Sequence, residues 1–190
     1  MSIFKKYFSD EIFKDRIQNE CENATDVLIP LFHTNELWRA NLLSIYREIP
    51  VNRLLIGNAG SSDDSLGVLR DFPRVTVFDH RAFTSLGYSI RKLIDAVQTE
   101  WFIYLHSDVY LPEGWFQKML KHQKEYDWFE CQQRLTLLEE WTPDYYSGKN
   151  LDRPHSGSQM GRKAAFNKIL PLIEDDYLYR NEDLIIARLL

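Results

Sequence analysis

The stretch FIYLHSDVYLPEGW, residues 102–115, contains an apolar run that ends abruptly in ionisable side chains. Its first four residues are apolar or aromatic, as expected of a buried strand. His106, Ser107 and Asp108 follow directly. Because alternate residues of an extended backbone point to the same side, His106 and Asp108 would share one side. Two interpretations follow: a metal-binding pair at the end of a core strand, or side chains that are simply solvated or cap the next helix.

A regular alternation of strands and helices surrounds this stretch. Short apolar segments predict strands at residues 27–31, 53–56, 75–78, 101–105 and 128–132. Helical periodicity or composition predicts helices at residues 36–47, 86–97, 113–125 and 162–170, with another that ends near residue 70. Such an alternation is typical of an α/β fold, with a mainly parallel sheet covered by helices on both faces. Right-handed crossovers would place the carboxyl ends of the strands at one edge, where ligands bind.

The two ends of the chain differ from this central pattern. Residues 3–17 have an aromatic and apolar stripe with lysines beside it, which predicts an amphipathic helix. That helix could lie on a membrane surface or pack on its own domain. We therefore divide the chain into an N-terminal helix and linker, residues 1–25, and one α/β domain, residues 26–190. The last residues end within a helical pattern without Gly or Pro, which is typical of a truncated or unusually short domain.

Composition excludes several classes of protein. The hydrophobic share of 44% suits one globular domain, and the net charge of −5 argues against binding to a nucleic acid backbone. Cys21 and Cys131 are far apart and lack metal-ligand spacing, so reduced thiols are expected, although a disulfide stays open. No apolar run is long enough to span a membrane, and the N-terminus is too charged for a secretion signal. We expect a cytoplasmic protein.

Two further segments carry polar groups at places where chemistry could occur. The loop GNAGSSDDS, residues 57–65, has neither the lysine of a P-loop nor the glycine spacing of a dinucleotide site. It is interpreted either as a turn with a helix cap or as part of a binding site. Asn181, Glu182 and Asp183 begin the last helical segment. Carboxylates there either cap the helix or act as a general base at the sheet edge.

Five segments in register make the chain resemble the family 2 glycosyltransferases, an inverting family with a GT-A fold, over residues 26–190. These segments are DVLIPLFHTNELWRANLLSI (26–45), LLIGNAGSSDD (54–64), SLGYSIRKLIDAV (85–97), WFIYLHSDVYLPEGW (101–115) and NEDLIIAR (181–188). They look like the family's opening strand and helix, its Asp-Asp loop, its Gly-containing helix, its Asp-x-Asp motif and its Glu-Asp motif. The resemblance implies transfer of a sugar from a nucleotide-diphosphate sugar to an unknown acceptor hydroxyl.

The resemblance also implies roles for particular residues. Those expected to contact the nucleotide sugar are Pro30, Phe32, Asn58, Asp63, Gly87, Arg91 and Ser107. Asp108, together with His106, would hold Mn²⁺ or Mg²⁺ on the diphosphate. Asp183, with Glu182 as the second choice, would be the catalytic base. The acceptor could be a saccharide, lipid or protein, and peripheral membrane contact through the N-terminal helix stays open.

Two departures from the family pattern affect the expected chemistry. Asn58 and Ala59 stand where the family usually has two aspartates, so the base preference is open. His106 replaces the first Asp of the metal motif, which weakens capture of Mg²⁺ and favours manganese. The main alternative is therefore a non-catalytic GT-A module that binds a sugar nucleotide or a partner protein. A nucleotidyltransferase is disfavoured because Leu31-Phe32-His33-Thr34 lacks the glycine-rich loop expected after the first strand.

Overall fold

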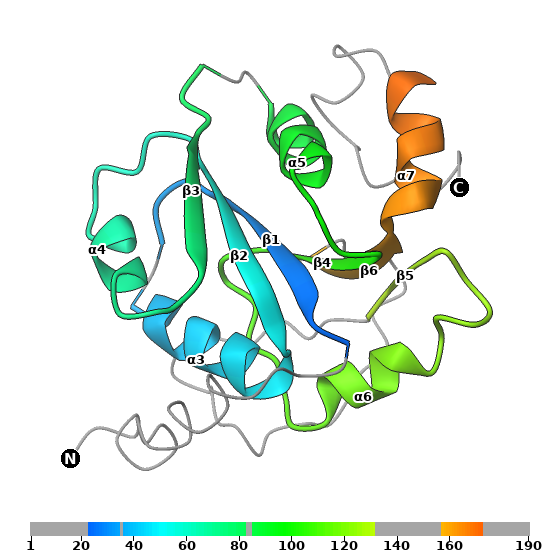
Figure 1. Cartoon of the computed structure of the whole chain (residues 1–190). Helices are drawn as coiled ribbons and strands as arrows, with labels where there is room; N and C mark the ends of the chain where they lie inside the picture. The colour runs from blue at the N-terminus through cyan, green and yellow to red at the C-terminus, as the bar shows by residue number, and fades with distance from the viewer. Residues whose placement is uncertain (1–22, 35, 83–84, 132–156, 173–190) are drawn as a thin grey trace, which may run out of the picture.

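The computed structural model describes residues 23–34, 36–82, 85–131 and 157–172. The strands are β1 (Thr25–Leu31), β2 (Val51–Asn58), β3 (Val75–Asp79), β4 (Trp101–Leu105), β5 (Trp128–Glu130) and β6 (Ser158–Arg162). The helices are α3 (Trp38–Glu48), α4 (Ser65–Leu69), α5 (Leu86–Asp95), α6 (Trp115–Leu120), α7 (Lys163–Ile169) and the short 3₁₀ helix η2 (Leu170–Leu172). Together they form an α/β fold in which one sheet has helices on both faces (Figure 1). This confirms the fold class predicted from the sequence.

The described strands form a six-stranded sheet in the order β3-β2-β1-β4-β6-β5. β1 pairs in parallel with both β2 and β4, and β2 pairs in parallel with β3. The carboxyl ends of these four strands therefore meet at one edge of the sheet, as predicted. β6 runs antiparallel to both β4 and β5, so it is the strand that makes the sheet mixed.

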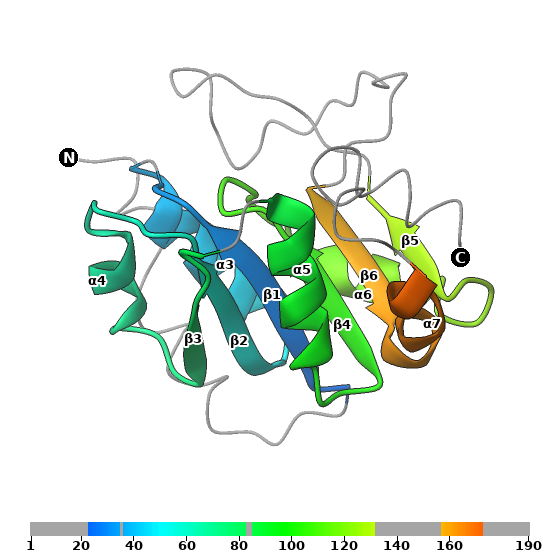
Figure 2. The ribbon, with the colours of Figure 1, turned by 90° about the horizontal axis from the view of Figure 1, so that it is seen from above.

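Apolar side chains on both faces of the sheet explain why the central strands are apolar throughout. Val27 and Ile29 of β1 belong to a core cluster with α3, α4 and α6, whereas Leu28 belongs to a second cluster with α5 and α7. Figure 2 shows α5 over the central strands on one side, with α3 on the other. A strand buried on both faces does not alternate between polar and apolar residues.

The prediction was wrong where β6 forms. Residues 142–158 are rich in Pro, Gly, Asp and Tyr, a composition that predicts a long loop before the helix expected from residue 162. Instead, residues 158–162 pair with β4 and β5. The sequence of this strand, SQMGR, lacks the β-branched and aromatic residues that indicate strands. Gly161 fits because an added Cβ would lie 2.6 Å from Phe166 Cε2 and 3.0 Å from Phe102 Cζ. The helix expected over residues 113–125 is also shorter, since α6 ends at Leu120.

Several predicted features lie outside the described residues. These are the helix at residues 3–17, the linker up to residue 22, most of the long loop before residue 158, and the Glu182-Asp183 pair. Among the helices that the structure describes, none combines the length and the apolar character needed to cross a membrane.

Candidate functional site

A cavity of about 650 Å³ lies at the carboxyl edge of the parallel strands. The chain continues from β1 to β2 and β3 on one side, whereas β4 lies on the other side of β1. Loops that leave β1 and β4 therefore diverge, and open α/β sheets bind ligands in the crevice at such a switch point. Residues from the ends of all four parallel strands and from α5 line the cavity: Pro30, Leu31, Phe32, His33, Thr34, Gly57, Ala59, His80, Ser85, Leu86, Ser89, His106, Ser107 and Asp108.

The loop after β1 forms the first wall, and the loop after β2 holds it in place. The His33 backbone amide donates to Ser61 Oγ at 3.0 Å, and Nε2 of the His33 ring lies 2.9 Å from Ser62 Oγ. These contacts accompany a left-handed backbone at His33, with φ of 54°. The neighbouring Phe32 ring is 64% exposed and also lines the cavity. An exposed aromatic ring at the mouth of a cavity can stack on a flat ligand group.

Asn58 and Asp63 organise the loop after β2 and are not among the residues that line the cavity. Asn58 Oδ1 accepts hydrogen bonds from the backbone amides of Gly60, at 3.1 Å, and Ser61, at 2.9 Å. Asp63 Oδ2 accepts from the Thr34 amide at 2.8 Å, while Oδ1 accepts from the Ser65 amide and hydroxyl. The Ser65 hydroxyl, followed by the Thr34 amide, lowers the pKa of the Asp63 carboxyl. Both side chains therefore shape the cavity through the loops.

The His-Ser-Asp stretch forms the wall at the end of β4. His106, Ser107 and Asp108 all line the cavity. The backbone is not extended there: residues 107 and 108 form a turn, and the Val109 amide donates to the His106 carbonyl at 3.3 Å. The His106 amide donates to the Gly157 carbonyl at 2.9 Å, which continues the pairing of β4 with β6.

An imidazole and a carboxylate are the groups on this wall that could hold a divalent cation. Within the described part of the chain, no three His, Cys, Asp or Glu side chains cluster closely enough to bind a metal. Among the described residues of this wall, His106 and Asp108 could supply two ligands. Mg²⁺ sites on nucleotides commonly take this form, with few protein ligands and several phosphate oxygens.

His80 forms the opposite wall, beyond the end of β3, and it is 3% exposed. Its Nδ1 lies 2.6 Å from Ser89 Oγ of α5. A Cβ at Gly57 would lie 2.5 Å from that His80 nitrogen, so the pair fits only because residue 57 lacks a side chain. Burial is the main cause of a lowered pKa at His80. The sequence pattern assigns no role to His33 or His80, although both come shortly after predicted parallel strands.

The sequence pattern of glycosyl transferase family 2 matches residues 26–184. The chain belongs to this family. A comparison with curated proteins gives no match.

Solved structures with a similar fold have low sequence identity to this family 2 chain. Residues 1–349 of TarS from S. aureus match with a TM-score of 0.65 and 11% identity, over 87% of this chain and 55% of that chain. The same protein in complex with UDP-GlcNAc matches with a TM-score of 0.58 and 11% identity, over 76% of this chain and 47% of that chain. This chain thus spans about half the length of those structures.

A third similar structure is that of a protein named for a different activity. A 4-diphosphocytidyl-2C-methyl-D-erythritol synthase matches with a TM-score of 0.54 and 11% identity, over 88% of this chain and 86% of that chain. At such identities the similarity establishes the fold, which is of the GT-A type expected from the sequence.

The remaining motif residues of this family 2 chain lie on α5 or outside the described residues. Ser85 caps α5 by accepting a hydrogen bond from the Tyr88 amide at 3.2 Å, and it lines the cavity. Gly87 is buried in the first turn, and Arg91 is half-buried one turn later; neither is among the lining residues. Glu182 and Asp183, the candidate bases, lie outside the part of the chain that the structure describes.

Proposed function

We propose that this family 2 chain is an inverting glycosyltransferase, which moves a sugar from a nucleotide-diphosphate sugar to an acceptor hydroxyl. The observation that carries the proposal is the cavity at the switch point of the sheet, with His106 and Asp108 on one wall. Family membership supports a nucleotide sugar as the donor. Because TarS, a protein of similar fold, was solved with UDP-GlcNAc, UDP-sugars are the first donors to test.

The lining of the cavity supports one orientation of the donor. The nucleoside would lie against Pro30 and Phe32, since the exposed Phe32 ring offers a flat apolar face. The diphosphate would then extend toward Ser107 at the end of β4. Asn58 and Asp63 would support the nucleoside end through the loop that they organise. Gly87 and Arg91 are proposed to act from α5, where the Arg91 guanidinium would add positive charge beside the sugar or diphosphate.

His106 and Asp108 would hold Mn²⁺ or Mg²⁺ on the diphosphate. Their chemistry fits this role, because a carboxylate binds either ion and an imidazole favours manganese. When bound, such an ion neutralises negative charge on the departing diphosphate.

The proposed reaction is a single displacement. Asp183, with Glu182 as the second candidate, would accept the proton of the acceptor hydroxyl. As the acceptor oxygen bonds to the anomeric carbon, the bond from that carbon to the diphosphate oxygen breaks, and the nucleoside diphosphate leaves with the electron pair. Attack from the opposite face inverts the configuration at that carbon.

Release of nucleoside diphosphate tests this proposal. The protein would be incubated with Mn²⁺ and a panel of UDP- and GDP-sugars, with and without simple sugar acceptors. We expect release by the wild type, loss in Asp108→Asn and unchanged release in Asp71→Asn, a control whose carboxylate pairs with Arg39 on the surface. Failure of the wild type to release a nucleoside diphosphate from any donor and acceptor would contradict the proposal.

The second candidate is a non-catalytic module that binds a sugar nucleotide or a partner protein. It is favoured by His106 in place of a carboxylate, and by Asn58 and Ala59 in place of two aspartates. Calorimetry separates the two candidates, because such a module would bind a sugar nucleotide without turning it over. A nucleotidyltransferase is a further alternative, which the fold of the third similar structure supports. Such an enzyme would release pyrophosphate from a nucleoside triphosphate.

A further inference from the structure

Two polar residues in the middle of α3 are fully buried, which requires an explanation. Asn41 is 1% exposed and Ser44 is 0% exposed, because both lie on the helix face that packs on the domain. Asn and Ser are weak helix formers, and buried polar groups need hydrogen-bond partners. We therefore expect the contacts of these two side chains to explain why polar residues occupy buried positions in this helix.

Both side chains contact the segment that follows β4. Asn41 Nδ2 donates to the Ser107 carbonyl at 3.0 Å. Ser44 Oγ accepts from the Leu111 amide at 3.0 Å and donates to the Asn41 carbonyl at 2.7 Å. Residues three apart on a helix are neighbours on its surface, so the pair forms one unit. It holds both ends of residues 107–111, and Asp108 lies between them.

The two candidate metal ligands are thus held by different parts of the fold. The sheet holds His106, whose amide bonds to the Gly157 carbonyl. Asp108 lies in the turn beyond the sheet, and α3 holds that turn through Asn41 and Ser44. One ion can bind both His106 and Asp108 only if the sheet and α3 keep these two residues at a constant relative position.

We propose that Asn41, acting with Ser44, is a positioning residue that sets the metal affinity of His106 and Asp108. The inference rests on the proposed function, because it takes these two residues as the ligands. Without the Asn41 amide, the Ser107 carbonyl loses its donor from α3 and the turn gains freedom. Groups that orient metal ligands typically contribute 10- to 100-fold in metal affinity. Asn41→Leu, similar in size, should therefore weaken Mn²⁺ binding by at least about tenfold.

Other contacts should keep this variant folded. Arg47 Nη2 donates to the Leu111 carbonyl at 2.6 Å, and Glu48 Oε2 accepts from the Trp115 amide at 3.1 Å. The segment thus stays attached to α3 beyond the turn when Asn41 is replaced. A merely structural role for Asn41 predicts a lower melting temperature with unchanged metal affinity.

Electron paramagnetic resonance of free Mn²⁺ tests the inference without measuring turnover. Mn²⁺ would be titrated into wild type, Asn41→Leu and Asn52→Leu, each with UDP and separately with GDP, and each variant would be melted. Asn52 is the matched control, because its amide donates to Asp26 at 2.8 Å at the opposite end of the sheet. We expect weaker Mn²⁺ binding in Asn41→Leu only, even if both variants melt at lower temperature.

The outcomes separate this inference from the proposed function. Wild-type affinity in a folded Asn41→Leu protein would overturn the positioning role and leave the metal proposal intact. Absence of protein-dependent Mn²⁺ binding in the wild type would overturn both. If Asn41→Leu does not fold, Ser44→Ala, which removes the bond to the Leu111 amide, decides: weaker Mn²⁺ binding supports the inference, and unchanged binding overturns it.

Discussion

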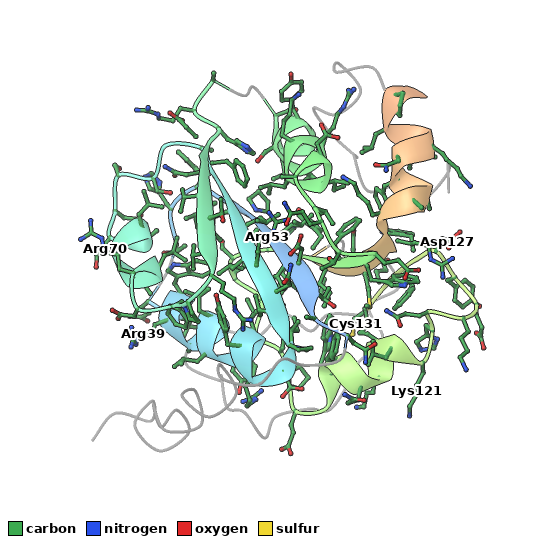
Figure 3. All side chains as sticks on the ribbon, in the orientation of Figure 1. Arg39, Arg53, Arg70, Lys121, Asp127 and Cys131 are labelled. Carbon is green, nitrogen blue, oxygen red and sulfur yellow. The ribbon has the colours of Figure 1, made fainter. Side chains whose placement is uncertain are left out.

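Asp26 and Arg53 form an ion pair at the end of the sheet opposite the cavity, with 2.6 Å between Asp26 Oδ2 and Arg53 Nη2. The Asp26 side chain is 0% exposed, and the Arg53 side chain is 23% exposed. The same carboxylate accepts hydrogen bonds from Asn52 Nδ2 at 2.8 Å and from the Gln98 amide at 2.7 Å. Figure 3 shows Arg53 over the central strands, whereas Arg39 lies at the periphery. One buried anion therefore joins β1, β2 and the segment after α5.

Removal of this anion should destabilise the protein strongly. Asp26→Ala would leave the Arg53 charge and two further donors without their acceptor, which typically lowers the free energy of unfolding by about 3–5 kcal/mol. The control is Asp71→Ala, since the Arg39–Asp71 pair has side chains 46% and 59% exposed. Exposed pairs contribute about 1 kcal/mol or less. Urea denaturation would contradict the prediction if both variants lost the same stability.

The fit between Gly57 and His80 predicts a second change in stability. Gly57→Ala would bring a methyl group 2.5 Å from His80 Nδ1 and 2.8 Å from Ser89 Oγ. Such overpacking typically destabilises a core by about 1–3 kcal/mol. The double variant Gly57→Ala/His80→Ala should lose less stability than the sum of the two single variants, because the clash with the His80 ring is absent there. Strict additivity in denaturation experiments would show that the two sites are independent.

His80 should make the stability depend on pH. Burial lowers its pKa below the ordinary value of 6.5, against an opposing effect of Asp79, while Lys92 adds to the lowering. The unfolded chain therefore takes up a proton first as the pH falls. The contribution of His80 to stability is complete above about pH 6.5 and is lost as the pH falls through the folded-state pKa.

Substitution of His80 checks this dependence. Urea denaturation of the wild type and of His80→Gln would be compared between about pH 7.5 and pH 5.5. We expect a smaller loss of stability on acidification in the variant, whatever its stability at neutral pH. The same loss in both proteins would exclude His80 as a source of the pH dependence.

Replacement of the proposed base separates chemistry from binding. Asp183→Asn should lower sugar transfer by about 10²- to 10⁴-fold, because the amide cannot accept the acceptor proton. UDP or GDP affinity, measured by calorimetry, should stay at the wild-type value. Unchanged turnover in Asp183→Asn would remove the residue from this role, and the same measurement on Glu182→Gln would then identify the second candidate.

The imidazole of His106 predicts which metal the protein prefers. His106→Asp would replace a nitrogen ligand by a carboxylate and add a negative charge, which favours Mg²⁺ relative to Mn²⁺. We therefore expect the ratio of Mg²⁺-supported to Mn²⁺-supported nucleotide release to rise in this variant. Full removal of divalent metal with a chelator should abolish release by both proteins. A ratio equal to that of the wild type would mean that His106 does not contact the ion.

Local sequence pattern was enough to predict the four parallel strands and the edge at which their loops meet. Each of these strands is a short apolar run followed by a helical segment, and parallel pairing with right-handed crossovers leaves few arrangements. For the same reason, the order of residues along the chain is sufficient to place His106, Ser107 and Asp108 at the same edge as Pro30 and Phe32, and all five line the cavity.

Tertiary structure decided what depends on contacts between distant residues. β6 forms although SQMGR has no strand pattern, because β4 and β5 offer it partners on both sides. Likewise, Asp63 Oδ2 accepts from the Thr34 amide of the loop after β1, which no residue spacing indicates. Periodicity and propensity describe neighbours along the chain, whereas the bond from Asn41 to Ser107 joins residues 66 positions apart. Such a bond exists only once α3 has packed against the segment after β4.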